Sequence, residues 1–288
     1  MASHRIATYS VDGSTRYGVV AEGGLVDLSA RFGKDYPTLR EAIAAGALTK
    51  LAEDAAKRSP DHALDAITWQ PPIPAPEKII CIGVNYPDRN EEYKDGSERP
   101  KYPSIFTRSH TSFAAPGQPI LRPRESQQLD YEGEIVIIIG QGGRRIPQES
   151  ALSHVFAYSC ANEGSVRDWL RHSKFNVTQG KNFDRSGSIG PWLVTADEVG
   201  SAPLRVVTRV NGEERQNDTS DRMIFQMPYL IHYLSTFCTL EPGDVILTGT
   251  PSGAGARFDP PRYLEAGDEV EVEVSRVGLL RNKVVDDE

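Results

Sequence analysis

The stretch from Asp130 to Gly140, DYEGEIVIIIG, restricts the fold more than any other part of this chain. Consecutive aliphatic residues from Ile135 to Ile139 place apolar side chains on both faces of a β-strand, so the strand must lie in a sheet that is covered on both sides. Yet Glu132 and Glu134 precede this run and point to the same face, with Cα atoms roughly 6.5–7 Å apart. Burying an unpaired carboxylate costs on the order of several kcal/mol. We therefore expect a positive group between these glutamates.

Short apolar runs separated by glycine and proline continue through most of the chain and predict further strands. The expected strands cover 78–84, 119–121, 155–160, 192–195, 204–210, 244–247 and 269–274. Helices are expected at 163–172 and 227–237, with a weaker one near Asn90. Because strands and helices do not alternate regularly, the pattern predicts a mainly β or α+β fold with a closed or sandwich-like sheet, not a doubly wound one.

The first 72 residues differ from the rest and predict a small α+β domain. Short alternating runs between Ile6 and Leu28, broken at Asp12-Gly13 and Gly23-Gly24, indicate antiparallel strands with tight turns. Thr38 and Glu41 form the pattern of a helix-capping box, and a second helix is expected at 51–57. The prolines of WQPPIPAPEK can continue neither a helix nor a strand. We place a boundary there, between a domain of residues 1–72 and one of 73–288.

Charge and cysteine usage exclude several classes of protein. The chain has 32 Lys and Arg against 40 Asp and Glu, a net charge of -8. No basic stripe is present, so nucleic acid and membrane surfaces are not expected partners. The N-terminus does not resemble a signal peptide, and no apolar run approaches the roughly 18 residues of a membrane span, so we expect a cytoplasmic protein. Cys81, Cys160 and Cys238 are widely spaced and are expected to be reduced.

A third carboxylate could complete a metal site with Glu132 and Glu134. In CANEGSVRDW, Asn162 can cap the expected helix, which would put Glu163 in its first turn. Three carboxylates without thiolate or imidazole would select Mg²⁺, Mn²⁺ or Ca²⁺. The alternative is structural: Glu132 and Glu134 could face solvent on an edge strand, while Glu163 favours the helix dipole. The residues alone leave both readings open.

Four motifs in this order resemble the fumarylacetoacetate hydrolase family: DYEGEIVIIIG, CANEGSVRDW, GKNFDRSGSIGPW and GDVILTGTPSGAG. The resemblance extends from Lys78 to Asn282, and the N-terminal segment is similar to a cap domain that many members carry. It implies a mixed β-roll in the C-terminal domain, a homodimer, and a divalent cation, commonly Mg²⁺, held by three carboxylates.

The resemblance also implies roles for individual residues. Glu132 and Glu134 correspond to metal ligands, and Lys181 corresponds to a lysine whose ammonium could hold a keto or enolate oxygen. Substrate-binding positions fall on Tyr86, Arg108 and Thr250. Without the resemblance, Lys181 would be read as a solvated lysine and Arg108 as a surface residue.

Two positions depart from the family pattern. Glu163, followed by Gly164, stands where an aspartate is usual, which lengthens the side chain by one methylene and implies a metal site with altered geometry. In NYPDRNEEY, which we call the lid segment (residues 85–93), Arg89 stands where hydrolases of the family have a histidine and Glu92 where they have a glutamate. Arginine stays protonated and cannot be a general base, whereas Glu92 could serve as one. The alternative is an Arg89–Glu92 ion pair on a solvated helix.

The expected function is metal-dependent chemistry on a small oxo-acid substrate. A cation bound to the α-keto-carboxylate would stabilise an enolate, so C–C bond hydrolysis of an acylpyruvate-like substrate, isomerisation or tautomerisation, and decarboxylation of a 2-oxo-diacid all remain open. We rank hydrolysis first, because Glu92 could orient water. The family resemblance implies the breakdown of aromatic compounds as the pathway. Two other classes compete: a binding protein without turnover, and a structural site whose carboxylates pair with arginines such as Arg167.

Overall fold

The computed structural model describes residues 5–92, 98–173 and 176–288. Residue 93 of the lid segment and residues 94–97 after it lie outside this described part. The strands are β1 (Arg5–Val11), β2 (Ser14–Ala21), β3 (Gly24–Asp27), β4 (Thr68–Trp69), β5 (Ile79–Gly83), β6 (Ser104–Thr107), β7 (Phe113–Ala114), β8 (Ile120–Arg122), β9 (Leu129–Asp130), β10 (Gly133–Ile139), β11 (Val155–Asn162), β12 (Ser165–Val166), β13 (Gly187–Thr195), β14 (Arg205–Val210), β15 (Glu213–Thr219), β16 (Val245–Leu247), β17 (Glu269–Val274) and β18 (Gly278–Asp286). The α-helices are α1 (Ser29–Phe32), α2 (Leu39–Ala44), α3 (Leu48–Ala55), α4 (Pro87–Glu91), α5 (Thr178–Lys181), α6 (Ala196–Val199) and α7 (Met227–Phe237).

The central element is β10, the strand that begins the sequence argument. It pairs antiparallel with β11 on one side and with β16 on the other, within a large sheet of order β3-β2-β1-β13-β11-β10-β16-β5-β6. Ile135, Ile137 and Ile139 join one hydrophobic cluster, while Val136 and Ile138 join another on the opposite face. The prediction that both faces of this strand are buried is therefore confirmed.

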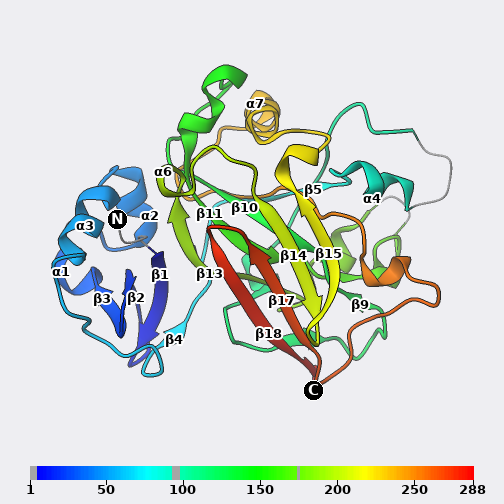
Figure 1. The fold of residues 1–288 in the computed structure, drawn as a ribbon, viewed down its shortest axis with the longest axis horizontal. Helices are drawn as coiled ribbons and strands as arrows, with labels where there is room; N and C mark the ends of the chain where they lie inside the picture. The colour runs from blue at the N-terminus through cyan, green and yellow to red at the C-terminus, as the bar shows by residue number, and fades with distance from the viewer. Residues whose placement is uncertain (1–4, 93–97, 174–175) are drawn as a thin grey trace.

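A second sheet closes the roll over one of these clusters. Its order is β15-β14-β17-β18-β8, and it lies across the large sheet in Figure 1. The sequence of β17, EVEVEV, alternates strictly, so its valines are buried and its glutamates lie on the outer side. Val206, Val272 and Val274 of this sheet pack in the same cluster as Ile135. The mainly β, α+β fold class is confirmed.

The N-terminal segment lies at one side of the roll, at the blue end of the ribbon in Figure 1. Its strand β1 pairs with β13, so the large sheet continues into it. Tyr17 and Leu39 belong to the same cluster as Val136, which carries that core across residue 73. The expected capping box is present, because the Thr38 side chain accepts from the Glu41 amide and the Glu41 carboxylate accepts from the Thr38 amide. The division into domains at residue 73 stays a prediction.

One expected helix, at residues 163–172, is wrong. The chain remains extended to Asn162, turns at Glu163-Gly164, and pairs again as β12 with β9. Asn162 does not cap a helix, because its side-chain oxygen accepts from the amide of Glu132 on the neighbouring strand. A Cβ on Gly164 would lie 1.9 Å from the carbonyl oxygen of Ser186, so this glycine permits a close approach of two backbones. Tertiary pairing thus overrides the local helix signal.

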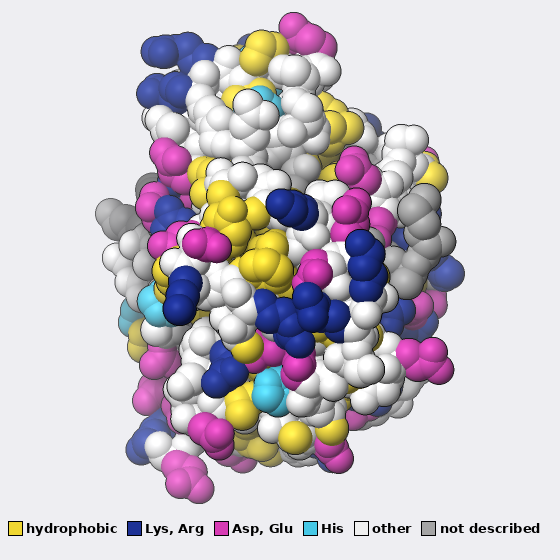
Figure 2. Space-filling view, turned by 90° about the vertical axis from the view of Figure 1, so that its left-hand side faces the viewer, with side chains coloured by type: hydrophobic (Ala, Val, Ile, Leu, Met, Phe, Trp, Pro, Cys, Tyr) yellow, Lys and Arg dark blue, Asp and Glu magenta, His cyan; other side chains and the backbone are white. Residues whose placement is uncertain are grey.

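The surface and the helices complete the description. Figure 2 shows acidic and basic side chains interspersed with hydrophobic ones on the face that the N-terminal segment presents. In the described part of the chain, no helix combines the length and the apolar character that crossing a membrane requires. Cys81, Cys160 and Cys238 are free thiols.

Candidate active site

A cavity of about 240 Å³ collects side chains from segments that are far apart in the sequence. The expected site residues that line it are Arg89, Glu132, Glu134, Glu163, Lys181 and Thr250, and Arg167 joins them. Ile82 and Gly83, at the end of β5, and Phe106 of β6 form part of the wall. The fold therefore brings together three acidic and three basic side chains, and it buries all of them except Arg167, whose side chain is 10% exposed.

Glu132 is the most heavily hydrogen-bonded of the carboxylates. Its Oε1 accepts from Arg167 Nη2 at 2.8 Å and from Arg89 Nη2 at 3.1 Å, and its Oε2 accepts from Ser165 Oγ at 2.6 Å and from Lys181 Nζ. Burial works to raise the pKa of Glu132, but Arg167, Lys181 and Arg89 outweigh it and hold this pKa well below its usual value. Glu132 is thus an anion whose charge is fully compensated by the protein.

Lys181 is the positive group expected between the acidic side chains, although the second carboxylate it contacts is Glu163. It ends α5, and its Nζ donates to Oε2 of Glu132 and to Oε2 of Glu163. Burial acts to lower the pKa of Lys181, but the two carboxylates more than offset this and the pKa is raised. The ammonium also lies 5.0 Å from the ring centroid of Phe106. The reading of Lys181 as a solvated lysine is therefore wrong, since its side chain is only 7% exposed.

Glu134 differs from Glu132, because its Oε2 accepts from a backbone amide, that of Gly249, at 2.7 Å. Burial raises the pKa of Glu134 well above its usual value, and the charges of Glu163 and Glu132 raise it further. Gly249 can aim its amide here because it adopts a φ of +99°, where a side chain would also clash with Asn85. The glycine of the TGTPSG motif thus serves the carboxylate at the start of β10.

Glu163 lies at the turn after β11 and is paired on its far side by Arg108. Arg108 Nη1 donates to Glu163 Oε1 at 2.7 Å, and Nη2 donates to Ser186 Oγ at 2.9 Å. The guanidinium carbon lies 4.3 Å from the ring centroid of Phe113. These contacts place Arg108 behind Glu163 and not in the wall of the cavity. Burial raises the pKa of Glu163, which Lys181 and Arg108 only partly counteract.

In the lid segment, Arg89 lines the cavity and pairs with Glu92. Arg89, on α4, is 2% exposed and donates from Nη1 to Glu92 Oε2 at 2.8 Å as well as to Glu132. Glu92 Oε1 accepts from the amide of Gly253 at 2.7 Å. The predicted Arg89–Glu92 pair therefore exists, but Arg89 is buried and lines the cavity, and the Glu92 side chain is only 19% exposed. Each carboxylate oxygen of Glu92 accepts from one donor.

Thr250 lines the cavity, but its hydroxyl is already used. Its Oγ1 donates to the carbonyl oxygen of Gly133 at 3.0 Å and accepts from Gln216 Nε2 at 2.8 Å. Gln216 also accepts from the amide of Gly133, so it ties the TGTPSG turn to the start of β10. Sequence reasoning missed Gln216, because nothing in the local pattern of β15 marks it.

Asp130 and Arg167 form a second connection between the TGTPSG region and the start of β10. Sequence reasoning placed Arg167 only in the structural alternative, as a partner of the carboxylates, and gave Asp130 no role in the site. Arg167 Nε donates to Asp130 Oδ2 at 2.7 Å, while Asp130 accepts from the amides of Gly255 and Ala256. Arg167 therefore connects the turn after TGTPSG to Glu132. Both residues stood inside the recognised motifs DYEGE and NEGSVRDW, which was the available signal.

Tyr86, the last of the expected substrate-binding residues, lies elsewhere, as do His110 and His172, the histidines nearest to the motif segments. Tyr86 is fully buried in the hydrophobic cluster with Ile135, where burial raises the pKa of its hydroxyl. His172 stacks on Trp169 with ring centroids 4.1 Å apart, and His110 is exposed in a short 3₁₀-helix. These positions give neither histidine a place in the cavity wall, which is formed by other residues.

The donor chemistry of the site fits a divalent metal ion. Glu132, Glu134 and Glu163 supply the oxygen donors that Mg²⁺, Mn²⁺ and Ca²⁺ prefer, and like charges crowd around Glu134. Among the residues that the structure describes, however, no three acidic, histidine or cysteine side chains lie close enough together to hold a metal as they stand. The ammonium of Lys181 lies between two of the three carboxylates, so Lys181 would have to move. This ligand set stays a prediction.

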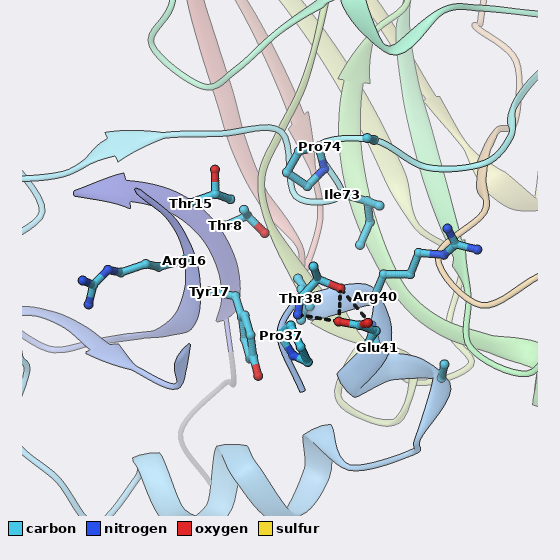
Figure 3. A pocket seen from close by; sticks show the side chains of 13 residues that line it. Thr8, Thr15, Arg16, Tyr17, Pro37, Thr38, Arg40, Glu41, Ile73 and Pro74 are labelled. Carbon is cyan, nitrogen blue, oxygen red and sulfur yellow. Dashed lines mark hydrogen bonds between the residues drawn. The ribbon is translucent and has the colours of Figure 1, made fainter. Parts of the chain in front are cut away.

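A larger cavity, of about 620 Å³, lies between the N-terminal strands, α2 and the proline-rich linker (Figure 3). Its polar side chains are engaged within the protein: Thr8 donates to the carbonyl of Pro72, Tyr17 to that of Tyr36, and Arg16 to Asp27. Thr38 and Glu41 form the capping box seen at its edge in Figure 3. Size alone therefore does not identify the site, and the smaller charged cavity is the candidate.

Comparisons with known proteins agree with this choice. The model of the fumarylacetoacetate (FAA) hydrolase C-terminal family matches residues 78–285. The oxaloacetate tautomerase YisK of Bacillus subtilis (strain 168) is 41% identical over 227 residues, which are 77% of this chain and 75% of that protein. The mitochondrial oxaloacetate tautomerase fahd2 of Xenopus laevis is 40% identical over 268 residues, 91% of this chain and 83% of that protein.

Solved structures share the whole fold. A fumarylacetoacetate hydrolase from psychrophilic Exiguobacterium antarcticum superposes with a TM-score of 0.82 at 35% identity, covering 99% of this chain and 100% of that one. The maleylpyruvate hydrolase of Sphingobium sp. SYK-6, in complex with manganese(II) and pyruvate, gives a TM-score of 0.81 at 27% identity, with 99% and 100% covered. Enzymes with this fold therefore include tautomerases and hydrolases.

Proposed function

Because this chain belongs to the fumarylacetoacetate hydrolase family, we propose that it is a metal-dependent tautomerase that interconverts the enol and keto forms of a small 2-oxo-dicarboxylic acid such as oxaloacetate. The sequence motifs alone ranked C–C bond hydrolysis first. The tautomerases from Bacillus subtilis and Xenopus laevis, at 41% and 40% identity, favour the isomerase and tautomerase alternative over hydrolysis.

The observation that carries this choice is the position of Glu92 and the hydrogen bonds that it accepts. Hydrolysis of a C–C bond needs a base that activates water, and Glu92 was the candidate. Its Oε2 accepts from Arg89 and its Oε1 from the amide of Gly253, and Glu92 is not among the residues that line the cavity. Arg89 cannot replace it, since a guanidinium stays protonated. Tautomerisation has no need of an activated water.

Glu132, Glu134 and Glu163 would hold the divalent metal ion, which the family uses and which the maleylpyruvate hydrolase contains as manganese. When bound, a cation of this kind polarises the 2-oxo group and favours negative charge on its oxygen. Mg²⁺ is the expected ion, with Mn²⁺ or Ca²⁺ as alternatives. The remaining steps fall to the side chains of this chain.

Lys181 is the proton carrier in this proposal. Its Nζ reaches Glu132 and Glu163 in the cavity, and it is the flexible cation among the lining residues. In the enol-to-keto direction, Nζ gives a proton to C3 as the C2–C3 double bond becomes single, and the enol hydroxyl returns a proton to Nζ as the C2–O bond becomes double. The proton moves from oxygen to carbon, and nothing else is consumed.

Hydrolysis remains the second candidate function. It is favoured by the similarity over the full chain to the maleylpyruvate hydrolase. It would require Glu92 to turn into the cavity when substrate binds. A homodimer, a cytoplasmic location and a role in aromatic-compound breakdown remain further predictions, which rest on the family resemblance and the sequence.

The test is turnover by protein loaded with Mg²⁺ or Mn²⁺, beside protein treated with chelator. Freshly dissolved enol-oxaloacetate and acetylpyruvate would be followed by the absorbance of the enol, with pyruvate measured separately in each reaction. We expect metal-dependent loss of enol absorbance without release of pyruvate. Release of acetate and pyruvate from acetylpyruvate would favour hydrolysis, and release of pyruvate and CO₂ from oxaloacetate would favour decarboxylation.

A further inference from the structure

We propose that Arg89 selects dicarboxylic over monocarboxylic 2-oxo acids, by binding the second carboxylate of the substrate from the lid side of the cavity. This inference rests on the proposed function and names the residue that would set its substrate class. The starting observation is that Arg89 is buried in the cavity. An enzyme that binds only a metal ion and one carboxylate would not need an arginine at this position.

The first argument is the position of Arg89. Its side chain is 3% exposed, lines the cavity and comes from α4, and its Nη2 donates to Glu132, which immediately precedes β10. In the proposed pose, a substrate whose 2-oxo-carboxylate end lies near Glu134 and Glu163 presents its far end to Arg89. A guanidinium offers paired N–H donors in one plane, which match the two oxygens of a carboxylate.

The second argument is that Arg89 can exchange one partner at small cost. Its hydrogen bond to Glu132 is the longest that Glu132 accepts, 3.1 Å against 2.8 Å from Arg167 and 2.6 Å from Ser165. If Arg89 turns to a substrate carboxylate, Glu132 Oε1 keeps Arg167 and Oε2 keeps Ser165 and Lys181. No buried carboxylate oxygen is left without a donor, so the usual penalty for breaking such a pair does not arise.

The third argument is that Arg89 stays anchored during this exchange. Its Nη1 donates to Glu92, and Glu92 accepts from the amide of Gly253. These hydrogen bonds fix Nη1 of the guanidinium relative to the loop after TGTP. On the outer side of the same helix, Asp88 pairs with Arg222 at 2.6 Å. Nη1 can therefore keep Glu92 when Nη2 exchanges Glu132 for a substrate carboxylate, and the helix does not have to move.

The experiment compares ligands that differ only at the far end. Difluoro-oxaloacetate and 3,3-difluoro-2-oxobutanoate both lack hydrogen at C3 and cannot enolise, but only the first has a second carboxylate. Their binding to Mn²⁺-loaded protein would be measured by calorimetry. We expect wild type to bind the dicarboxylate about 10- to 100-fold more tightly, as a hydrogen-bonded charge pair of about 1.5–3 kcal/mol implies.

The variants then assign the preference to Arg89. Arg89→Gln should abolish the preference, and Arg89→Lys should restore part of it, since lysine keeps the charge without the fork. Arg222→Gln is the matched control, because it removes the arginine on the outer side of the same helix and should leave the preference unchanged. Loosening of the lid would weaken both ligands alike, so the ratio of their affinities isolates the carboxylate contact.

Two outcomes would overturn the inference: equal binding of the two ligands by wild type, or a preference that Arg89→Gln retains. The proposed function fails separately, if metal-loaded wild type leaves enol-oxaloacetate unchanged. The same ratio should appear in turnover, where Arg89→Gln raises KM for oxaloacetate about 10- to 100-fold and KM for acetylpyruvate by less than about 3-fold.

Discussion

Two buried carboxylates in this molecule show what separates a structural ion pair from a functional one. Asp27, at the end of β3, is 1% exposed and accepts from Arg16 at 2.8 Å and from the amide of Ala30 at 2.9 Å. Glu132 is 4% exposed and accepts from two arginines, a lysine and a serine. By burial and pairing alone, the two residues look alike.

Their surroundings differ. Asp27 has one acidic neighbour, Asp61, which accepts from the Asp27 amide and has its own cation, Arg31. The Asp27 carboxylate also accepts from the amide of Ala30 at the start of α1, and its Oδ2 lies 3.4 Å from His62 Nε2, so it joins local elements of the N-terminal segment.

Glu132 shares a cavity with two further carboxylates, and one of these, Glu134, has a raised pKa because burial and its acidic neighbours act together. Crowded like charges around a cavity are costly for folding and useful for binding a cation. The comparison predicts that changes at Asp27 affect stability alone, while changes around Glu132 affect chemistry.

The largest expected effect is that of Lys181→Met. The variant keeps an unbranched side chain but loses the ammonium that contacts Glu132 and Glu163. We expect kcat for enol-oxaloacetate to fall about 10²- to 10⁴-fold, the range for loss of a proton-transferring group. Stopped-flow measurement of enol absorbance would test it, with circular dichroism to verify folding. A kcat within about 3-fold of wild type would remove Lys181 from the mechanism.

Glu132→Gln should have the next largest effect, because it keeps the shape and removes the charge. Arg89, Arg167 and Lys181 would lose a shared partner, so we expect the free energy of unfolding to fall by about 3–5 kcal/mol. Binding of Mn²⁺, measured by calorimetry, should be lost as well. Wild-type Mn²⁺ affinity in this variant would make Glu132 a structural residue like Asp27.

Asp27→Asn is the same isosteric change at the other carboxylate. Arg16 is 34% exposed and can be hydrated when its partner is lost, so we expect a smaller destabilisation, about 2 kcal/mol, in urea unfolding. Mn²⁺ binding and turnover should equal those of wild type. A clear drop in Mn²⁺ affinity would end the distinction between the two sites.

The smallest expected effect is the pH dependence of the free energy that Asp27 contributes to folding. Burial acts to raise the pKa of Asp27, but the amide of Ala30, Arg16 and His62 outweigh it, so this pKa is lowered in the folded protein. A lowered pKa stabilises the fold above the unfolded value of about 3.9, and this stability is lost as pH falls through the folded pKa. The difference in unfolding free energy between wild type and Asp27→Asn should therefore shrink from pH 7 toward pH 3. A difference that stays constant over this range would contradict the charge-based explanation.

Several elements could be predicted because local chemistry specifies them. The aliphatic run of β10, the alternation of β17, the helix at 227–237 and the Thr38–Glu41 capping box follow from side-chain period and capping, and the structure confirms them. The helix expected after Asn162 failed, because a cap signal competed with strand pairing across more than thirty residues. A local preference for helix is overridden where backbone groups from a distant segment form the hydrogen bonds instead.

The sequence by itself determined that a doubly covered strand carries two acidic residues into the core, and that motifs of one family surround them. Only the tertiary structure decided which cations compensate these charges. Lys181 reaches Glu132 and Glu163, while Arg108 turns away behind Glu163, and Arg89 faces inward from α4. The reason is physical: a side chain's type fixes its charge, but the partner of a buried charge depends on which segments the packed sheets bring within hydrogen-bonding distance.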